Sequence, residues 1–171
     1  VDEFAKLIAI HKPDAVQFVA TSASRDVSNR GEFFAGVKER LGIEPTVISG
    51  TEEARLSFLG ATSGIGETSD NLKPPYLVVD IGGGSTEFVI GTDGPGRAIS
   101  MDIGCVRMTE RHFHEDPPTP AQIAAATQDI DEAIKIADAN VDLGSAQSII
   151  GVAGSVTTVA ALALGLPEYD P

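Results

Sequence analysis

A turn with three consecutive glycines has the composition of a phosphate-binding site. It follows the apolar run that opens the stretch YLVVDIGGGSTEFVIG, residues 76–91. Glycines permit positive φ angles and let backbone N–H groups approach a ligand closely, and the two hydroxyl residues that follow add donors. A bulged hairpin, whose glycines serve only backbone geometry, is the alternative. The candidate phosphate-binding residues of this turn are Gly82, Gly83, Gly84, Ser85 and Thr86.

Acidic residues stand at both ends of this turn. Asp80 ends the preceding predicted strand, where its carboxylate is available to a hydrated Mg²⁺, a hard cation that prefers oxygen ligands. Glu87 lies two residues past Ser85, so strand alternation puts both side chains on one face. Glu87 can therefore point at whatever the turn holds, and a solvated glutamate on the outer face is the alternative.

A second glycine turn has the same architecture. In IIGVAGSVTT, an apolar strand leads through Gly151 to Gly154 and Ser155, where a helix is expected to begin. The first turn of a helix offers unpaired N–H donors and partial positive charge, which suits a phosphate group. Close packing of the strand against the helix would explain the same glycines equally well.

A pair of acids opens another predicted helix, in SGTEEARLSFLG. A glutamate at this place, Glu52 or Glu53, could orient or deprotonate a water for in-line attack on a phosphate chain. Spacing alone favours a different interpretation, since acids are common in the first turn of any helix because they complement its dipole.

The remaining polar candidates are ambiguous. Arg25 follows a predicted strand and could hold a phosphate oxygen or form a surface ion pair, and Arg107 allows the same two interpretations. His112 and His114 should diverge on a short helix, which indicates surface residues rather than a metal site. Cys105 stands among apolar neighbours and is expected to be a small core residue.

Apolar periodicity and capping residues predict alternating helices and strands in the first part of the chain. An amphipathic helix runs from the first residue to Pro13, and a second lies between Asn29 and Gly42, with Glu32 three residues after its N-cap. The other expected elements are strands over 15–21 and 46–49 and a helix over 51–61. The segment from Thr62 to Pro75 is rich in turn-forming residues and is the best candidate for a domain boundary.

Beyond that segment the pattern predicts an antiparallel meander followed by helices. Strands are expected over 76–81, 86–91 and 97–102, then a short helix around CVRMTERHF. Thr119, Pro120 and Gln122 mark a clear helix start, with the apolar residues Ile123, Ile130, Ile134, Ala137 and Val141 on one face. A buried strand over 147–154 leads into a last helix. The fold class is α/β with a mixed sheet.

Composition limits the classes of partner. The 171 residues are 42% hydrophobic, and 25 acidic against 12 basic residues give a net charge of −13. This charge disfavours a nucleic acid or an anionic membrane as partner, so an anionic ligand must be held locally. The sequence has a single cysteine and contains no apolar run near 18 residues, and a cytoplasmic location is expected.

The motifs together resemble the exopolyphosphatase/guanosine-pentaphosphate phosphohydrolase family, within the actin/Hsp70/sugar-kinase superfamily. The resemblance runs from about Phe18 to the C-terminus, and its most specific segments are ISGTEEARLSF and VVDIGGGSTEFVIG. It implies an actin-like ATPase (ribonuclease H-like) fold with mixed sheets of the five-stranded type flanked by helices. Residues 1–72 would be the last part of a first such domain, and residues 73–171 the first part of a second.

The same resemblance implies roles for individual residues. Asp80 and the first glycine turn would form the second phosphate motif, and Gly151 to Thr157 the nucleotide-proximal turn, with Ser155 where many members have threonine. Glu53 would position or activate the attacking water, and Glu87 would be a second essential carboxylate near the Mg²⁺ (or Mn²⁺). The family's first phosphate loop is absent, so these residues are expected to be the middle of a longer protein.

The resulting functional prediction is a Mg²⁺-dependent phosphohydrolase that releases terminal orthophosphate from inorganic polyphosphate. The alternatives are a guanosine pentaphosphate 5'-phosphohydrolase, a sugar or acid kinase of the same superfamily, and a regulator that binds guanosine tetra- or pentaphosphate without catalysis. The full-length protein is expected to be a homodimer, without a nucleic-acid or membrane partner. This chain by itself is expected to lack part of the phosphate site.

Overall fold

The computed structural model of the chain describes residues 1–65 and 71–168. The chain divides into two compact units, Val1–Ser49 and Gly50–Pro171, and each is described by itself. This division precedes the helix over 51–61, whereas the predicted domain boundary near residue 72 follows it. Part of the segment proposed as the boundary, residues 66–70, lies outside the described residues. The domain boundary therefore stays a prediction.

The first unit combines helices with two short strands. Its elements are α1 (Asp2–His11), β1 (Val19–Ala20), α2 (Ser22–Asp26), α3 (Arg30–Leu41) and β2 (Thr46–Val47). β1 and β2 pair in parallel, with Val19 opposite Thr46, and both are shorter than predicted because a ladder extends only where a partner strand accompanies it. Gly42 ends α3 with φ 68°, as expected, whereas Asn29 caps the helix without a side-chain hydrogen bond.

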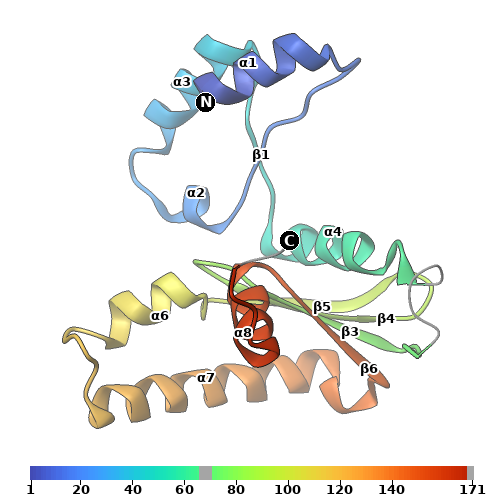
Figure 1. Cartoon of the computed structure of the whole chain (residues 1–171), viewed down its shortest axis with the longest axis vertical. Coiled ribbons are helices and arrows are strands. Elements are labelled where there is room, and N and C mark those ends of the chain that lie inside the picture. Colours follow the sequence, from blue (N-terminus) through green and yellow to red (C-terminus); the bar gives the residue numbers. More distant parts are fainter. Residues whose placement is uncertain (66–70, 169–171) are drawn as a thin grey trace. The chain divides into compact units, whose positions relative to one another are not determined.

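The second unit is built on a four-stranded mixed sheet (Figure 1). Its strands are β3 (Tyr76–Ile81), β4 (Thr86–Gly91), β5 (Pro95–Met101) and β6 (Ser148–Val152), in the order β5-β4-β3-β6. β3, β4 and β5 form the predicted antiparallel meander, and β6 joins β3 in parallel. The α/β class with a mixed sheet is confirmed.

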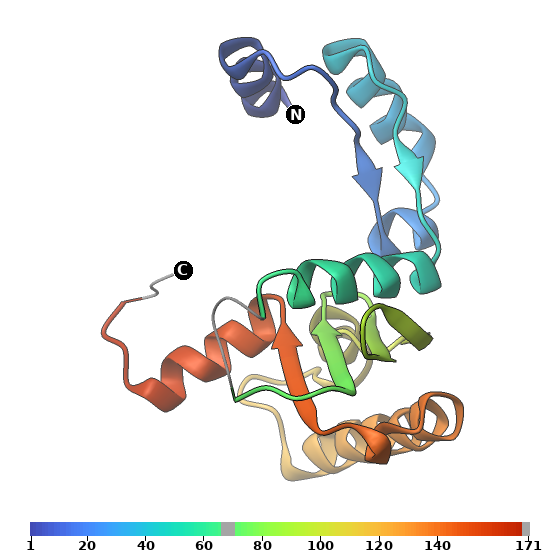
Figure 2. The same ribbon diagram turned by 90° about the vertical axis from the view of Figure 1, so that its right-hand side faces the viewer.

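Helices cover both faces of this sheet. They are α4 (Gly50–Thr62), α6 (Cys105–His112), α7 (Pro120–Val141) and α8 (Gly154–Leu164), with a short 3₁₀ helix over Leu143–Ser145. Within this unit, α4 and α7 lie on opposite sides of the strands (Figure 2). Phe58 of α4 packs on Val78 and Val89, while Leu77 and Phe88 face α7. The alternation along β3 and β4 thus assigns Val78, Asp80, Glu87 and Val89 to the α4 side.

The long helix α7 begins as predicted and buries part of its predicted apolar face. Thr119 and Gln122 form a reciprocal capping box, and Pro120 is the first helical residue. Ile123 and Ile134, expected in the core, are 48% and 39% exposed. Ala137 and Val141 of the predicted face are buried, and Ala126 and Ala133 are the other buried positions of α7. Small side chains let the helix axis approach the sheet closely, so the larger isoleucines flank the contact.

Candidate functional site

On the face of the sheet that α4 covers, polar residues of β3, β4 and β5 are directly paired across the strands. Asp80 of β3 is directly opposite Glu87 of β4, and Glu87 is opposite Ser100 of β5. Directly paired residues of neighbouring strands project to the same face, so their side chains are neighbours. The hairpin register alone therefore places both predicted acids at one site.

Glu87 is buried, with a side chain only 1% exposed. Ser100 Oγ donates a hydrogen bond of 2.6 Å to Glu87 Oε1, and the Ser85 side chain also bonds to this carboxylate. Burial raises the pKa of Glu87, the two serine hydrogen bonds oppose that rise, and the negative charges of Glu53 and Asp80 add to it. A solvated glutamate on an outer face is thereby excluded.

Helix α4 brings the third acid to this site. Glu53 and Ser57 are four residues apart, one turn along the same face of the helix, and both are partly buried. Ser57 Oγ donates a hydrogen bond of 2.7 Å to Asp80 Oδ2. The charge of Glu53 is close enough to influence the pKa of Glu87. The predicted set of Glu53, Asp80 and Glu87 is therefore together in the structure.

The first glycine turn is held through its carbonyl oxygens. Cys105 N donates to Gly82 O at 3.0 Å, and Val106 N donates to Gly83 O at 2.9 Å, both from the start of α6. The Arg107 side chain donates through Nε to Gly84 O at 2.6 Å. Because the N–H of a trans peptide points away from its carbonyl, the amides that follow these carbonyls face away from α6.

The hydroxyl groups of this turn are used inside the protein. Ser85 and Thr86 are each 3% exposed, and Thr86 Oγ1 donates to Ile103 O at 3.2 Å. The single proton of the Thr86 hydroxyl is thus not offered to a ligand, contrary to expectation. The amides of Gly83 and Gly84, by contrast, make no backbone hydrogen bond within the described residues. These N–H groups are the donors that the turn presents.

Gly104, which was not among the predicted site residues, lets the start of α6 pack directly against the turn. A Cβ at this buried position would lie 2.4 Å from the carbonyl carbon and oxygen of Gly83 and 2.6 Å from the carbonyl carbon of Gly84. Only glycine allows the two backbones to approach so closely. The signal available in the sequence was a glycine immediately before a predicted helix, which is also compatible with an ordinary N-cap.

A pocket of about 660 Å³ lies between the two glycine turns. The first turn contributes Gly82 and Gly83, and the start of α8 contributes Gly154 and Ser155. The complete lining is Ile81, Gly82, Gly83, Cys105, Ala153, Gly154, Ser155 and Thr158. Predicted phosphate-binding residues that are about 70 positions apart in the sequence thus face one cavity.

Phosphate binding and close packing were both considered for the glycines of the second turn, and the two glycines differ in their surroundings. A Cβ at Gly151 would lie 2.6 Å from Val156 Cγ1, so this glycine serves close packing of β6 against α8. Gly154 has nothing within 4 Å of such a Cβ and is open to the pocket. Ala153 between them has φ 72° and ψ 175°, a positive-φ conformation at the point where the strand ends and the helix starts. Close packing is therefore confirmed at Gly151, whereas phosphate binding at Gly154 stays a prediction.

The structure corrects the prediction for Cys105 and leaves the prediction for Arg25 open. Cys105 is exposed and lines the pocket, because it is the first residue of α6 and the buried position of that helix is Met108. Arg25 belongs to the first unit, where its Nη1 donates to Ile48 O at 2.9 Å. A role of Arg25 in phosphate binding stays a prediction.

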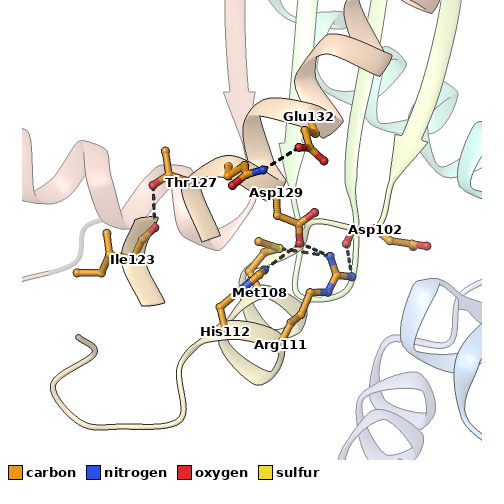
Figure 3. Close-up of polar contacts among 9 residues, drawn as sticks. Asp102, Met108, Arg111, His112, Ile123, Thr127, Asp129 and Glu132 are labelled. Atoms are coloured by element: carbon orange, nitrogen blue, oxygen red, sulfur yellow. Dashed lines mark hydrogen bonds and ion pairs between the residues drawn. The ribbon is translucent and has the colours of Figure 1, made fainter. Parts of the chain in front are cut away.

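The far end of α6 is fastened to α7 by charged groups (Figure 3). Asp129 Oδ2 accepts a hydrogen bond of 2.6 Å from Arg111 Nη1 and lies 2.8 Å from His112 Nε2. Arg111 also donates to Asp102 O at 3.2 Å. His112 and Arg111 hold the pKa of Asp129 below its usual value. His112 is thus a partly buried partner in this cluster, whereas His114 is exposed as expected.

The described residues contain no group of three or more histidine, cysteine, aspartate or glutamate side chains able to enclose a metal ion. Asp80 Oδ2 is bonded to Ser57, and Oδ1 makes no hydrogen bond to another described residue. A hard cation that keeps several of its own waters needs only one or two carboxylates from the protein. The donor set therefore fits Mg²⁺ or Mn²⁺.

Over residues 1–65 and 71–168, no helix has the length and apolar character to cross a membrane.

Comparison with known sequences gives one family. The profile of the Ppx/GppA phosphatase family matches residues 1–168. Exopolyphosphatase 2 of Mycobacterium tuberculosis is 43% identical over 173 aligned positions, which cover 98% of this chain and 53% of that protein. A guanosine-5'-triphosphate,3'-diphosphate pyrophosphatase of Pseudoalteromonas atlantica is 38% identical over 143 positions, which cover 83% of this chain and 27% of that protein.

Solved structures agree with this family. An exopolyphosphatase-like protein superposes with a TM-score of 0.94 and 56% identity, covering 99% of this chain and 54% of its own. The PPX-GPPA enzyme of Aquifex aeolicus superposes with a TM-score of 0.77 and 33% identity, at the same coverage of 99% and 54%. The chain thus spans about half the length of the first curated relative that it matches.

Proposed function

Since the chain belongs to the Ppx/GppA phosphatase family, we propose that it is part of a longer, two-domain phosphohydrolase that releases terminal orthophosphate from inorganic polyphosphate. The support for a longer protein is that the chain covers 53% of exopolyphosphatase 2 from M. tuberculosis and 54% of the exopolyphosphatase-like structure. We call this longer chain the full-length protein. The name of the first of these relatives supports the choice of substrate.

The observation that carries the proposal is that three acids gather on the α4 face of the sheet, where β3 and β4 meet the first glycine turn. Asp80 ends the strand that leads into the turn, Glu87 begins the strand that leaves it, and α4 adds Glu53. A phosphoanhydride is cleaved when water attacks phosphorus in line with the leaving oxygen, and catalysis is mostly positioning and charge stabilisation. In this proposal the amides of the turn donate to phosphate oxygens, and the carboxylates act from the ends of the two strands that flank the turn.

In the proposed mechanism, backbone amides of the two turns hold the phosphate oxygens. Glu53 orients a water and accepts its proton as the bond to phosphorus forms. Asp80 and Glu87 would hold Mg²⁺ or Mn²⁺, which when bound supplies positive charge next to the phosphate oxygens. Among the described residues the pocket lining has no lysine or arginine, so in this mechanism peptide dipoles and the bound cation would balance the charge of the substrate. This arrangement accommodates a polyanion despite the net charge of −13.

The test is substitution of Glu53 in the full-length protein. Glu53→Gln should lower the rate of phosphate release by at least about 100-fold, the lower range for loss of a general base, with substrate binding retained. The matched control is Glu52→Gln, the same chemical change at an exposed neighbour in the same helical turn. Equal turnover of the two variants and wild type would refute the role of Glu53.

A second candidate substrate has support from one observation. The relative from P. atlantica, which is 38% identical, carries the name of a guanosine pentaphosphate hydrolase. Phosphate release from long polyphosphate, short polyphosphate, guanosine pentaphosphate and ATP, measured in parallel, decides between the two. Transfer of phosphate to a sugar or acid acceptor, with no free phosphate released in its absence, would indicate a kinase. Binding without release would indicate a regulator. The homodimer and the cytoplasmic location stay predictions. Light scattering would test the homodimer, and cell fractionation would test the location.

A further inference from the structure

Asp80 has one hydrogen-bond partner within the described residues, and that partner lies on a different element. Ser57 Oγ of α4 donates to Asp80 Oδ2 at 2.7 Å. Glu87, in contrast, is held by two serines, Ser85 and Ser100, from its own hairpin and the next strand. Asp80 therefore depends on α4 for its orientation in a way that Glu87 does not.

The hydrogen bond is not what docks α4 on the sheet. Ala54 and Phe58 are both 0% exposed, and they pack against Val78 and Val89 beneath the helix. Burial of a phenylalanine side chain contributes more to stability than a typical hydrogen bond does. The apolar contact is the larger of the two, so loss of the Ser57 hydroxyl leaves the helix in place.

The hydrogen bond instead fixes the rotation of the Asp80 carboxylate. Oδ2 accepts this bond from α4, whereas Oδ1 makes no hydrogen bond within the described part of the chain. Ser57 is also one helical turn after Glu53, so the same contact sets the spacing between Glu53 on the helix and Asp80 on β3. A single hydroxyl thereby links the two acids that approach the site from separate elements.

We infer that Ser57 is a positioning residue of the site: its hydroxyl orients the Asp80 carboxylate for a divalent cation and holds Asp80 in register with Glu53. The inference rests on the proposed function. Groups that hydrogen-bond to a ligating carboxylate fix its orientation, and their removal costs about 10- to 100-fold in metal affinity or activity. A hydroxyl that only fastened the helix would have no such effect.

The experiment compares variants of the full-length protein by calorimetric titration with Mn²⁺ in the absence of substrate. Ser57→Ala should weaken Mn²⁺ binding by about 10-fold or more and lower kcat more than it raises KM for polyphosphate. Ser57→Thr keeps a hydroxyl and should recover most of the affinity. The matched control is Ser63→Ala, because the Ser63 hydroxyl donates only to Gly60 O near the end of the same helix.

A double substitution separates positioning from support of the fold. In an Asp80→Asn background, Ser57→Ala should cause no further loss of Mn²⁺ affinity, since the group it orients is already altered. Unchanged Mn²⁺ affinity in Ser57→Ala, or a lower melting temperature as its only effect, would overturn the inference. If wild type released no phosphate from any substrate, the proposed function would fail instead, while the Mn²⁺ titration would still test the contact of Ser57 with Asp80.

Discussion

Replacement of Gly104 by alanine should damage both the stability and the phosphate site. The new Cβ would lie 2.4 Å from the Gly83 carbonyl carbon and oxygen, whereas real Cβ contacts essentially never fall below 3.0 Å. The obstructing atoms are backbone, so either the turn or the first turn of α6 must move. Comfortable carbon–carbon separations are about 3.5–4.0 Å, which makes the required displacement about 1 Å.

The energetic cost follows from this displacement. Overpacking of a well-filled contact costs about 1–3 kcal/mol, and loss of one hydrogen bond between α6 and the turn adds about 0.5–1.5 kcal/mol. We therefore expect Gly104→Ala to lower the free energy of unfolding by about 1.5–4.5 kcal/mol. Polyphosphate binding should weaken as well, because the displaced carbonyls of Gly82 and Gly83 carry the amides of the turn with them.

The measurement is urea denaturation of the full-length protein, followed by circular dichroism, together with KM for polyphosphate at a temperature where the variant is folded. Gly60→Ala in α4 is the control, because nothing lies within 4 Å of its Cβ. Alanine at an open helical position should stabilise by about 0.5–1 kcal/mol. A Gly104→Ala variant that matches wild type within about 0.5 kcal/mol would refute the reasoning, as would equal destabilisation by both substitutions.

Three further substitutions test the core and the charged groups. Phe58→Ala removes a side chain that is 0% exposed and should cost about 3–5 kcal/mol in urea denaturation; a loss under about 1 kcal/mol would contradict the packing described for α4. Glu87→Gln should raise stability at pH 7 in metal-free buffer, because a carboxyl whose pKa is raised by burial loses stability as the pH rises from about 4.5 through its folded value. The advantage over wild type should vanish below pH 4.5, and a variant that is less stable at every pH would contradict this. Asp129→Asn should lower the melting temperature at pH 7, and the difference should shrink as the pH falls below the ordinary value of 3.8 toward the lowered pKa of Asp129. A difference that does not depend on pH would argue against the ion pairs with Arg111 and His112.

The elements that carry the site were predictable where a local pattern is sufficient. Strand alternation in β3 and β4 depends only on neighbouring residues, and it placed Asp80 and Glu87 near the turn correctly. The start of α7 was also predicted correctly, because Thr119 and Gln122 satisfy each other within one helical turn. Glu53 is different, since its position in the site was implied only by the family resemblance.

The features that were not predicted depend on contacts between distant residues. Gly104 meets the turn about 20 residues before it, and the Ser57 hydroxyl reaches Asp80 at a separation of 23 residues. Cys105 was assigned to the core from its apolar neighbours, but its position at the beginning of α6 turns it toward the pocket. The two strands of the first unit were predicted too long because the length of a ladder is set by its partner strand.

The hydrogen bonds between α6 and the glycine turn have an electrical consequence. A peptide whose carbonyl accepts a hydrogen bond becomes more polarised, and its N–H becomes a stronger donor. The carbonyls of Gly82, Gly83 and Gly84 all accept such bonds, and they belong to the same peptide units as the amides of Gly83, Gly84 and Ser85. The positive end of the α6 dipole thus polarises three peptide groups, and their N–H groups become stronger donors on the ligand side. Because peptide groups do not titrate, this attraction for an anion should persist across the whole pH range in which the fold is intact.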